Sequence, residues 1–467
     1  MQPSFDMPSV ILHLGLGSFH RAHQAVYLHR LIESGDASWV LAGGNIRPDM
    51  ADTLAALQSQ QGRYTLETVT PQGVRRHEQI SSIRTVVPFD PSLAGLVVLG
   101  ADARTRIVSF TVTEAGYYLD AGNRLDLGYD ELAADVQAAR SRRPGHTIYG
   151  ALTMILRERV RCGAGPVTLL NCDNLRHNGD RTRAGLLQFL ELVDDAELMG
   201  WVKRHASFPN SMVDRITPRP TPELAARVEA ATGRVDAAPV MAESFIQWVI
   251  ENRFAAGRPA WESVGVQMVA SVDPYEEAKI RILNASHSAI AWAGTLRGHR
   301  FIHEGVRDAP VRRIAHDYVS DDVIPVLQPS PIDLFAYRDQ VLERFGNPDL
   351  LDTNQRVAAD GFSKIPGFIV PTIRDRLGRG ESIASVAMLP ALFLAYLQHW
   401  QRGRLRYDYQ DQAMDPAAAR AICSAADPVA ALCSDTTLWG LLAGDARVIS
   451  ALRDASRRID DLVENPP

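Results

Sequence analysis

The chain has 467 residues, 46% of them hydrophobic and 22% charged, and carries a formal net charge of −6. This composition is that of a soluble globular protein with two or three domains. The acidic balance and the absence of a lysine-rich or arginine-rich block argue against a nucleic acid or an anionic membrane as partner.

The four cysteines, at positions 162, 172, 423 and 433, are scattered and form no C-x-x-C pair. This argues against a disulfide framework and a cysteine zinc site, and it fits reduced thiols in a cytoplasmic enzyme. The N-terminus has neither a basic region nor a long apolar run, so we expect no signal peptide. No stretch reaches about 18 uninterrupted apolar residues, so we expect no membrane-spanning helix.

The first half of the sequence alternates short apolar runs with helical patterns, which favours β-α-β units and a parallel sheet. The apolar runs predict strands over residues 10–14, 39–42, 107–112 and 166–170. Helices are predicted over residues 22–34, where Gly35 is the expected stop, and over 181–192.

From about residue 275 the pattern is mostly helical. The longest stretch is YEEAKIRILNASHSAIAWAG, with acidic residues early and Gly294 at its end. Further helices are predicted over residues 306–318, 334–345, 383–400 and 416–425. We therefore expect an α/β protein, with a nucleotide-binding domain over residues 1–272 and a mostly α-helical domain over residues 273–467.

The stretch ILHLGLGSFHRAH places a Gly-x-Gly turn between a predicted strand and a predicted helix. Gly15 would permit the tight turn, and Gly17 would let a pyrophosphate approach the start of the helix, where free N–H groups favour an anion. His20 replaces the third glycine of the dinucleotide fingerprint. The motif alone therefore leaves dinucleotide binding and an ordinary strand-to-helix turn equally open.

His20 and His23 offer a second interpretation of this turn, as a metal-binding pair three residues apart on one helix face. No nearby carboxylate or cysteine and no H-E-x-x-H motif supports it, so we expect no metal. Hydrogen bonds to neighbouring loops are the simpler role for both histidines.

After the second predicted strand, GGNIRPDM contains two side chains that bear on the choice of coenzyme. Asp49 is the acid available to bind the ribose hydroxyls of NAD, whereas Arg47 would suit the 2′-phosphate of NADP. We favour NAD, although the segment leaves open which of the two side chains faces the ribose.

Lys279, Asn284 and His287 stand out within the long helical pattern. At about 100° per residue, Asn284 lies about 140° and His287 about 80° from Lys279, so all three fit on one side of an α-helix. Together they suit alcohol oxidation, which needs a base for the hydroxyl proton and donors for the alkoxide-like oxygen. The plainer alternative is a solvated lysine and an exposed asparagine on an amphipathic helix.

A lysine can act as the base at neutral pH only if its pKa is lowered. A free lysine has a pKa of about 10.4, and lowering it by ~3 units requires roughly 4 kcal/mol of differential destabilisation of the ammonium form. Burial and a nearby nicotinium charge could supply that energy.

Other polar residues could complete such a site. Asn174 follows the end of a predicted strand, where α/β enzymes place ligand contacts, or it is simply a turn residue. Asp214 could accept hydrogen bonds from substrate hydroxyls or pair with Arg215. Arg356 and Lys364 lie near a predicted loop, either for substrate contacts or for surface solvation.

Seven segments together resemble the polyol-specific long-chain dehydrogenases, the mannitol dehydrogenase family. They are LHLGLGSFHRAHQAVYL, SFTVTEAGYY, LLNCDNLRHNG, FPNSMVDRITP, ESFIQWVIENRF, KIRILNASHS and TNQRVAADGFSKIP. The family carries Phe-His-Arg-Ala-His after its Gly-x-Gly, so His20 is no departure within it. The resemblance implies a Rossmann-type N-terminal domain, a helical C-terminal domain, an active site between them, and NAD or NADP without zinc.

The resemblance also implies roles for individual residues. Lys279 matches the general base, and His287 matches the histidine that orients the substrate. Asn174 and Asn284 match the two amides of an oxyanion hole. Polyol binding is implied for Asp214, Arg356 and Lys364, and we expect coenzyme binding at Gly15, Gly17, Ser18, Phe19, Asn45, Arg47, Asp49, Thr113 and Glu114.

The reaction that the resemblance implies is metal-independent, reversible hydride transfer from a small polyol to NAD, with D-arabinitol oxidised to D-xylulose. Mannitol oxidation and reduction of a fructuronate-type hexuronate are the alternatives. A non-catalytic nucleotide-binding protein is less favoured, and a metal-dependent hydrolase using His20 and His23 is weaker still. We expect a cytoplasmic monomer or small homo-oligomer.

Overall fold

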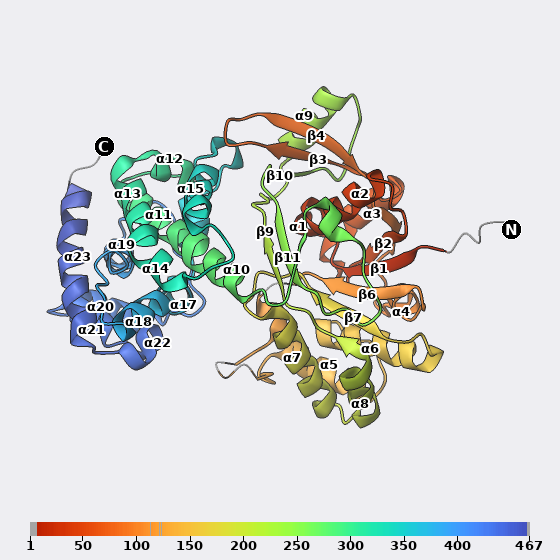
Figure 1. Ribbon diagram of the computed structural model, residues 1–467. Helices are drawn as coiled ribbons and strands as arrows, with labels where there is room; N and C mark the ends of the chain where they lie inside the picture. Colours follow the sequence, from red (N-terminus) through yellow and green to blue (C-terminus); the bar gives the residue numbers. More distant parts are fainter. Residues whose placement is uncertain (1–6, 113, 121, 123, 465–467) are drawn as a thin grey trace. The chain divides into compact units, whose positions relative to one another are not determined.

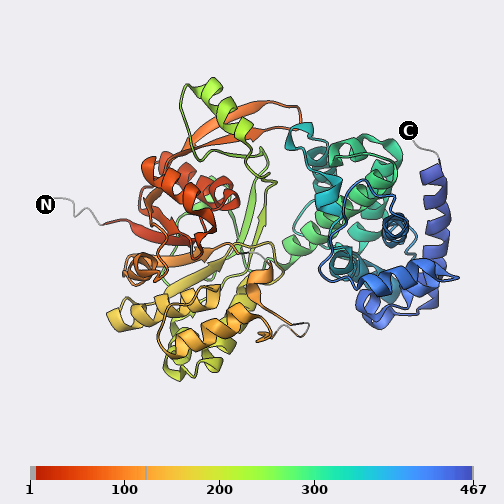
Figure 2. The same cartoon turned by 180° about the vertical axis from the view of Figure 1, so that it is seen from behind.

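The computed structural model describes residues 7–112, 114–120, 122 and 124–464. The chain divides into two compact units, shown from opposite sides in Figures 1 and 2. The first unit consists of Met1–Val69 and Arg75–Asp273, and the second of Thr70–Val74 and Pro274–Pro467. Both units therefore contain sequence-distant segments.

The first unit is built around a six-stranded sheet in which all paired strands are parallel. The order is β5-β2-β1-β6-β7-β8, which corresponds to the doubly wound order 3-2-1-4-5-6 of Rossmann folds. Such sheets bind ligands where the order reverses, here between β1 and β6. The strands are β1 (Ser9–Leu14), β2 (Trp39–Gly44), β5 (Ile83–Val86), β6 (Thr105–Phe110), β7 (Val167–Asn171) and β8 (Ala206–Ser207).

Alternate residues of β1 face two different layers of helices (Figure 1). Leu12 and Leu14 share a core with helices α4 to α8, whereas Ile11 packs with helices α1 to α3. This period of two is expected of a strand that is buried on both faces. The helices are α1 (Ser18–Ala22), α2 (Gln24–Glu33), α3 (Ala51–Ser59), α4 (Ala94–Gly100), α5 (Asp130–Arg140), α6 (Ile148–Cys162), α7 (Asn178–Leu192) and α8 (Ala196–His205).

Two three-stranded sheets also belong to the first unit, in the orders β10-β3-β4 and β12-β11-β9. The antiparallel β3–β4 hairpin has its tip, Thr70–Val74, assigned to the second unit. The remaining elements are β3 (Tyr64–Val69), β4 (Arg75–Ile80), β9 (Ser211–Asp214), α9 (Pro222–Thr232), β10 (Val240–Glu243), β11 (Gln247–Glu251) and β12 (Gln267–Val269).

The second unit is helical, and within its described residues no extended strand occurs. Its core surrounds α11 (Ala285–Leu296), where Ile290 and Trp292 are fully buried. In the part of the chain that the structure describes, no helix combines the length and apolarity needed to cross a bilayer. The other helices are α10 (Asp273–Ala278), α12 (Ile302–Arg307), α13 (Ala309–Asp317), α14 (Ile324–Leu327), α15 (Leu334–Phe345), α16 (Asn354–Ala358), α17 (Gly361–Lys364), α18 (Val370–Gly378), α19 (Met388–Gln401), α20 (Pro416–Ser424), α21 (Pro428–Cys433), α22 (Thr436–Trp439) and α23 (Ala446–Glu464).

Three details of the predicted helices are wrong. The helix expected over residues 22–34 is broken at His23, whose φ of −128° and ψ of −85° are not helical. The helix expected over residues 306–318 is divided at Asp308, whose extended backbone precedes α13. Gly294 does not end α11. It allows close packing instead, because a Cβ there would lie 2.9 Å from Asn354 Nδ2.

Candidate active site

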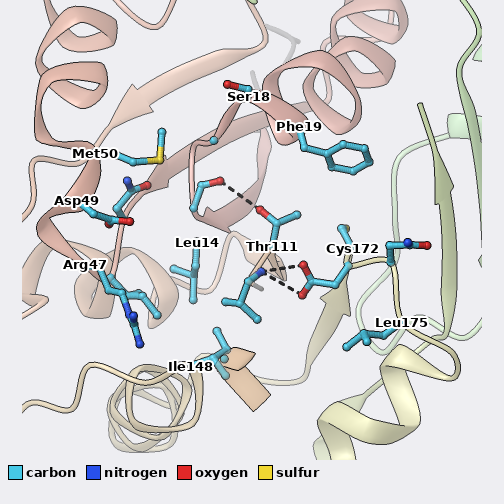
Figure 3. Close-up of a pocket in the computed structure, with 18 of the residues that line it drawn as sticks. Leu14, Ser18, Phe19, Arg47, Asp49, Met50, Thr111, Ile148, Cys172 and Leu175 are labelled. Carbon is cyan, nitrogen blue, oxygen red and sulfur yellow. Dashed lines mark hydrogen bonds between the residues drawn. The ribbon is translucent and has the colours of Figure 1, made fainter. Parts of the chain in front are cut away.

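The largest described hollow of interest lies in the first unit, at the carboxyl ends of β1, β2, β6 and β7 (Figure 3). Its volume is about 1160 Å³, above the roughly 300–1,000 Å³ of typical small-molecule sites. In Figure 3, Arg47 and Asp49 lie at one end of this cavity, and Cys172 and Leu175 at the other. Eight of the predicted site residues line it: Gly15, Gly17, Ser18, Phe19, Asn45, Arg47, Asp49 and Asn174.

The Gly-x-Gly turn leaves its backbone open to this cavity. Gly15 has a φ of +109°, and a Cβ there would lie 3.0 Å from the Thr111 carbonyl oxygen, so both conformation and space favour glycine. Gly17 precedes α1, and a Cβ added there would meet no atom within 4 Å. The intervening Leu16 N–H donates to Asn45 Oδ1 at 2.8 Å, which fixes the turn against the loop after β2.

Behind the turn, two buried histidines stack on each other. The rings of His13 and His20 lie 3.4 Å apart between centroids and 15° from parallel. His13 Nδ1 also lies 2.8 Å from Ser109 Oγ. Burial lowers the pKa of His13 to about 3 and that of His20 well below its usual range, so both rings are neutral in the folded protein at neutral pH.

This stack is expected to make the first unit sensitive to acid. An unfolded histidine with a pKa of about 6.5 takes up a proton that folded His13 refuses, so stability is complete above that pH and declines as the pH falls towards 3. His13 alone accounts for about 5 kcal/mol over that range. Calorimetric unfolding between pH 7.5 and 4 measures the decline. His13→Asn should flatten it, whereas the same change at exposed His146 should not. Parallel declines in all three proteins would contradict this origin.

His20 and His23 take structural positions. The His23 ring stacks on Phe19 with centroids 5.1 Å apart, and its Nε2 lies 2.8 Å from the Gln247 carbonyl oxygen. Among the residues that the structure describes, no cluster of three potential metal ligands includes either histidine. The contact to Gln247 is of the loop-bonding kind expected for these side chains.

The loops after β6 and β7 are joined by Asp173. Its carboxylate accepts hydrogen bonds from the Val112 N–H, at 2.8 Å, and from the Tyr117 hydroxyl. The predicted site residue Asn174 follows directly, so its backbone is anchored at this edge of the sheet. Asp173 was not among the predicted residues, although it belongs to the same NCDN segment.

Three further predicted residues of the first unit are placed less completely. Thr113 lies outside the described residues, and Glu114 begins the short helix η2 (Glu114–Tyr117). Asp214 is the buried last residue of β9, next to Val213, which lines the cavity. The neighbouring Arg215 donates hydrogen bonds to the carbonyl oxygens of Glu243 and Ala22.

In the second unit, Lys279 and Asn284 bound a π-helical turn, η4 (Lys279–Asn284), between α10 and α11. The Ala285 N–H bonds to the Ile280 carbonyl, five residues back. Residues five apart therefore lie about one turn above each other, so Lys279 and Asn284 share a side more closely than the roughly 140° of an α-helix allows. Lys279 is only 6% exposed, which contradicts the alternative of a solvated lysine.

His287 lies beyond this turn, on α11, and contacts a carboxylate that the sequence analysis missed. Its ring stacks on Phe345 with centroids 4.4 Å apart, and its Nε2 lies 3.1 Å from Asp352 Oδ2. Asp352 also accepts two hydrogen bonds from Arg356, at 2.8 and 2.7 Å. The sequence signal for Asp352 is its position four residues before Arg356, the spacing of ion pairs on a helix.

Charge and burial act against each other in this group. Burial lowers the pKa of His287, and the Asp352 carboxylate offsets part of that effect. Burial opposes ionisation of Asp352, but His287 and Arg356 outweigh it and lower the pKa of Asp352 to about 2. Nearby, Lys364 Nζ donates to the Val357 carbonyl oxygen at 2.6 Å. The second unit thus holds Lys279, Asn284, His287, Arg356 and Lys364 on α10 to α17.

A doubly wound sheet with an open cavity at its switch point defines a dinucleotide-binding protein. The Rossmann domain of mannitol dehydrogenase matches residues 9–263, and the C-terminal domain of mannitol dehydrogenase matches residues 271–460. The chain therefore belongs to the mannitol dehydrogenase family, which confirms the resemblance and the predicted fold class.

The relatives include two bacterial proteins of nearly the same length. The chain is 61% identical to D-arabinitol 4-dehydrogenase of Ralstonia nicotianae, over 97% of this chain and 96% of that protein. It is 51% identical to D-arabinitol 4-dehydrogenase of Klebsiella pneumoniae, over 97% and 98%. A solved structure, Pseudomonas fluorescens mannitol 2-dehydrogenase in ternary complex with NAD and D-mannitol, matches with a TM-score of 0.83 and 34% identity over 98% of this chain and 94% of that one.

Proposed function

We propose that the protein oxidises D-arabinitol to D-xylulose with NAD. Carbon 4 of the polyol loses a hydride to the coenzyme, and the hydroxyl on that carbon loses a proton, so NADH, a proton and the ketose are formed. The observation that carries the proposal is the 61% identity, over 97% of the chain, to a D-arabinitol 4-dehydrogenase. Mannitol is the second candidate, because the mannitol 2-dehydrogenase complex with D-mannitol has a TM-score of 0.83 to this chain.

The cavity of the first unit fits a dinucleotide. The open space at Gly17 leaves room for a pyrophosphate against the backbone, and the constraint on Gly15 keeps the turn tight. Asp49 lies on the short helix η1 (Pro48–Met50) after β2, where such folds place the acid that binds ribose hydroxyls. When bound, NAD supplies the hydride acceptor.

In the proposed reaction, Lys279 takes the proton of the reacting hydroxyl. Asn174 and Asn284 donate amide N–H groups to the oxygen as it gains negative charge. His287, held by Asp352, fixes a neighbouring hydroxyl of the polyol. Asp214, Arg356 and Lys364 bind the remaining hydroxyls. The proposal thus draws on residues of both units, and no covalent intermediate is needed.

The proposal also concerns where and how the protein works. It describes a cytoplasmic enzyme, a monomer or small homo-oligomer, that acts on a small polyol without a nucleic acid or membrane partner. The free cysteines Cys162, Cys172, Cys423 and Cys433 support a reducing compartment. The net charge of −6 supports the absence of a polyanionic partner.

A substrate panel tests the reaction directly. Purified protein is assayed with D-arabinitol, D-mannitol and D-fructuronate, with the oxidised or reduced coenzyme as each reaction requires. We expect kcat/KM for D-arabinitol with NAD to exceed that for mannitol by about tenfold or more. NMR of the product should show D-xylulose, whereas oxidation at carbon 2 would give D-ribulose. Higher kcat/KM with mannitol would overturn the choice of substrate, and coenzyme binding without turnover of any substrate would favour a non-catalytic protein.

A further inference from the structure

Three side chains that are distant in sequence form a hydrogen-bonded group at one end of the cavity. Arg47 follows β2, Tyr118 follows η2, and Glu131 lies in the first turn of α5. Arg47 Nη2 donates to Tyr118 Oη and to Glu131 Oε2, each at 2.7 Å. Tyr118 Oη donates to the same Glu131 oxygen at 2.5 Å. We call these three residues the arginine clamp.

The backbone of Tyr118 shows that the clamp is held in place by its surroundings. Tyr118 has a φ of +50°, a left-handed conformation that a bulky residue adopts only under constraint. Its side chain is only 4% exposed, and its ring packs edge-to-face on Tyr129 with centroids 5.6 Å apart. Strained residues of this kind concentrate at ligand-binding positions, where the surrounding fold compensates for their cost.

The charges within the clamp compensate each other. The hydrogen bond from Tyr118 and the charge of Arg47 lower the pKa of Glu131, so its carboxylate is ionised at neutral pH. Burial and Glu131 raise the pKa of Tyr118 to about 12, so its hydroxyl keeps the proton that it donates. One positive and one negative charge therefore lie side by side, with a neutral hydroxyl between them.

This arrangement bears on the two possible coenzymes. NADP differs from NAD by a 2′-phosphate on the adenosine ribose, and an arginine close to the second strand is the usual partner of that phosphate. Arg47 stands at that place in the chain, but its guanidinium is already bonded to Glu131 and Tyr118. Asp49 and Asp130 add two more carboxylates to the walls of the cavity, where they repel a phosphate dianion.

We propose that Glu131, with the help of Tyr118, keeps Arg47 engaged and its charge compensated, and that it thereby selects NAD over NADP. Glu131 is then a specificity-determining residue that acts through Arg47. Figure 3 agrees with this role, because the Arg47 side chain points away from Asp49, the acid proposed to bind the ribose. The inference rests on the proposed function as a dinucleotide-dependent dehydrogenase and adds the basis of its choice of coenzyme.

The test removes the charge of Glu131 and measures binding without any polyol. The full-length protein and its Glu131→Gln variant are titrated with NAD and with NADP by isothermal calorimetry. We expect the Kd for NADP to fall about tenfold, the scale of an exposed ion pair, while the Kd for NAD changes less than about twofold. A Kd for NADP that stays the same would overturn the inference.

Two further variants separate release of Arg47 from a general change of charge. Asp130→Asn removes the same charge one residue earlier on α5, from a side chain that lines the cavity outside the clamp. It should improve NADP binding by about twofold at most, and an equal gain would overturn the role of Glu131. Adding Arg47→Ala to Glu131→Gln should abolish the gain. A gain that persists would show that Arg47 does not receive the phosphate.

The titrations also separate this inference from the proposed function. If the unaltered protein oxidises D-arabinitol equally well with NAD and NADP, the function stands and the selectivity by Glu131 fails. If the unaltered protein binds NAD more tightly but turns over no polyol, the selectivity stands and the reaction fails. Binding of neither coenzyme would overturn both.

Discussion

Lys279→Ala is expected to lower kcat at neutral pH by about 10²- to 10⁴-fold, the usual contribution of a positioned general base. The variant should still bind NAD with an unchanged Kd, because the cavity for the coenzyme lies wholly within the first unit and Lys279 lies in the second. A kinetic assay with D-arabinitol and a calorimetric titration with NAD measure the two quantities separately.

The loss has a chemical signature that damage to the fold would not produce. A small primary amine added to Lys279→Ala should restore part of the rate, because it can take the proton in place of the missing side chain. Lys364→Ala is the matched lysine change, and it should raise KM more than it lowers kcat, since Lys364 is proposed to bind the substrate rather than to move the proton. Unchanged turnover of Lys279→Ala at neutral pH would rule this lysine out as the base.

Alanine at either of the two proposed oxyanion asparagines should lower kcat by about 10²- to 10³-fold. Asn174 and Asn284 are proposed to donate to the same oxygen, and that oxygen becomes strongly negative only as the hydride leaves. KM should therefore change little, because the interaction is stronger in the transition state than in the bound substrate. Steady-state kinetics with D-arabinitol and saturating NAD separate the two constants.

Asn174 and Asn284 come from different units, so similar losses in kcat from both changes would support a shared target. Asn252→Ala, a change at an exposed asparagine that accepts a hydrogen bond from Arg258, serves as the control and should leave kcat intact. A large rise in KM with normal kcat in either site variant would assign that asparagine to ordinary substrate binding instead.

Much of the fold follows from patterns that are local in sequence. The apolar run before Gly15 could only be a strand, because it ends in a turn that requires a positive φ, and β1 forms there. The helix over residues 334–345 was predicted with its observed bounds, since Asp333 caps it and the apolar spacing is regular. By contrast, nothing near His23 marks the break in the first helix, because its contacts with Phe19 and Gln247 arise only in the folded protein.

The site shows the same division between local and distant information. The coenzyme loops could be predicted, because in a doubly wound sheet each follows a strand end, and seven of the nine expected residues line the cavity. The partners of those residues could not, since Glu131 is 84 positions from Arg47 and belongs to no motif. Asp352 was missed for a related reason, because its link to His287 spans 65 residues and depends on how α11 and the loop before α16 pack.

The π-helical turn also has a consequence for how this segment responds to insertions and deletions. A π-turn contains one residue more than an α-turn. Deleting a single residue within Lys279–Asn284 would let regular α-helix form and would rotate all that follows by about 100° relative to Lys279. Asn284 and His287 would then turn together into another direction, even though every side chain of the proposed site remained in the chain. Side-chain substitution leaves that register untouched, so the segment is constrained in length before it is constrained in composition.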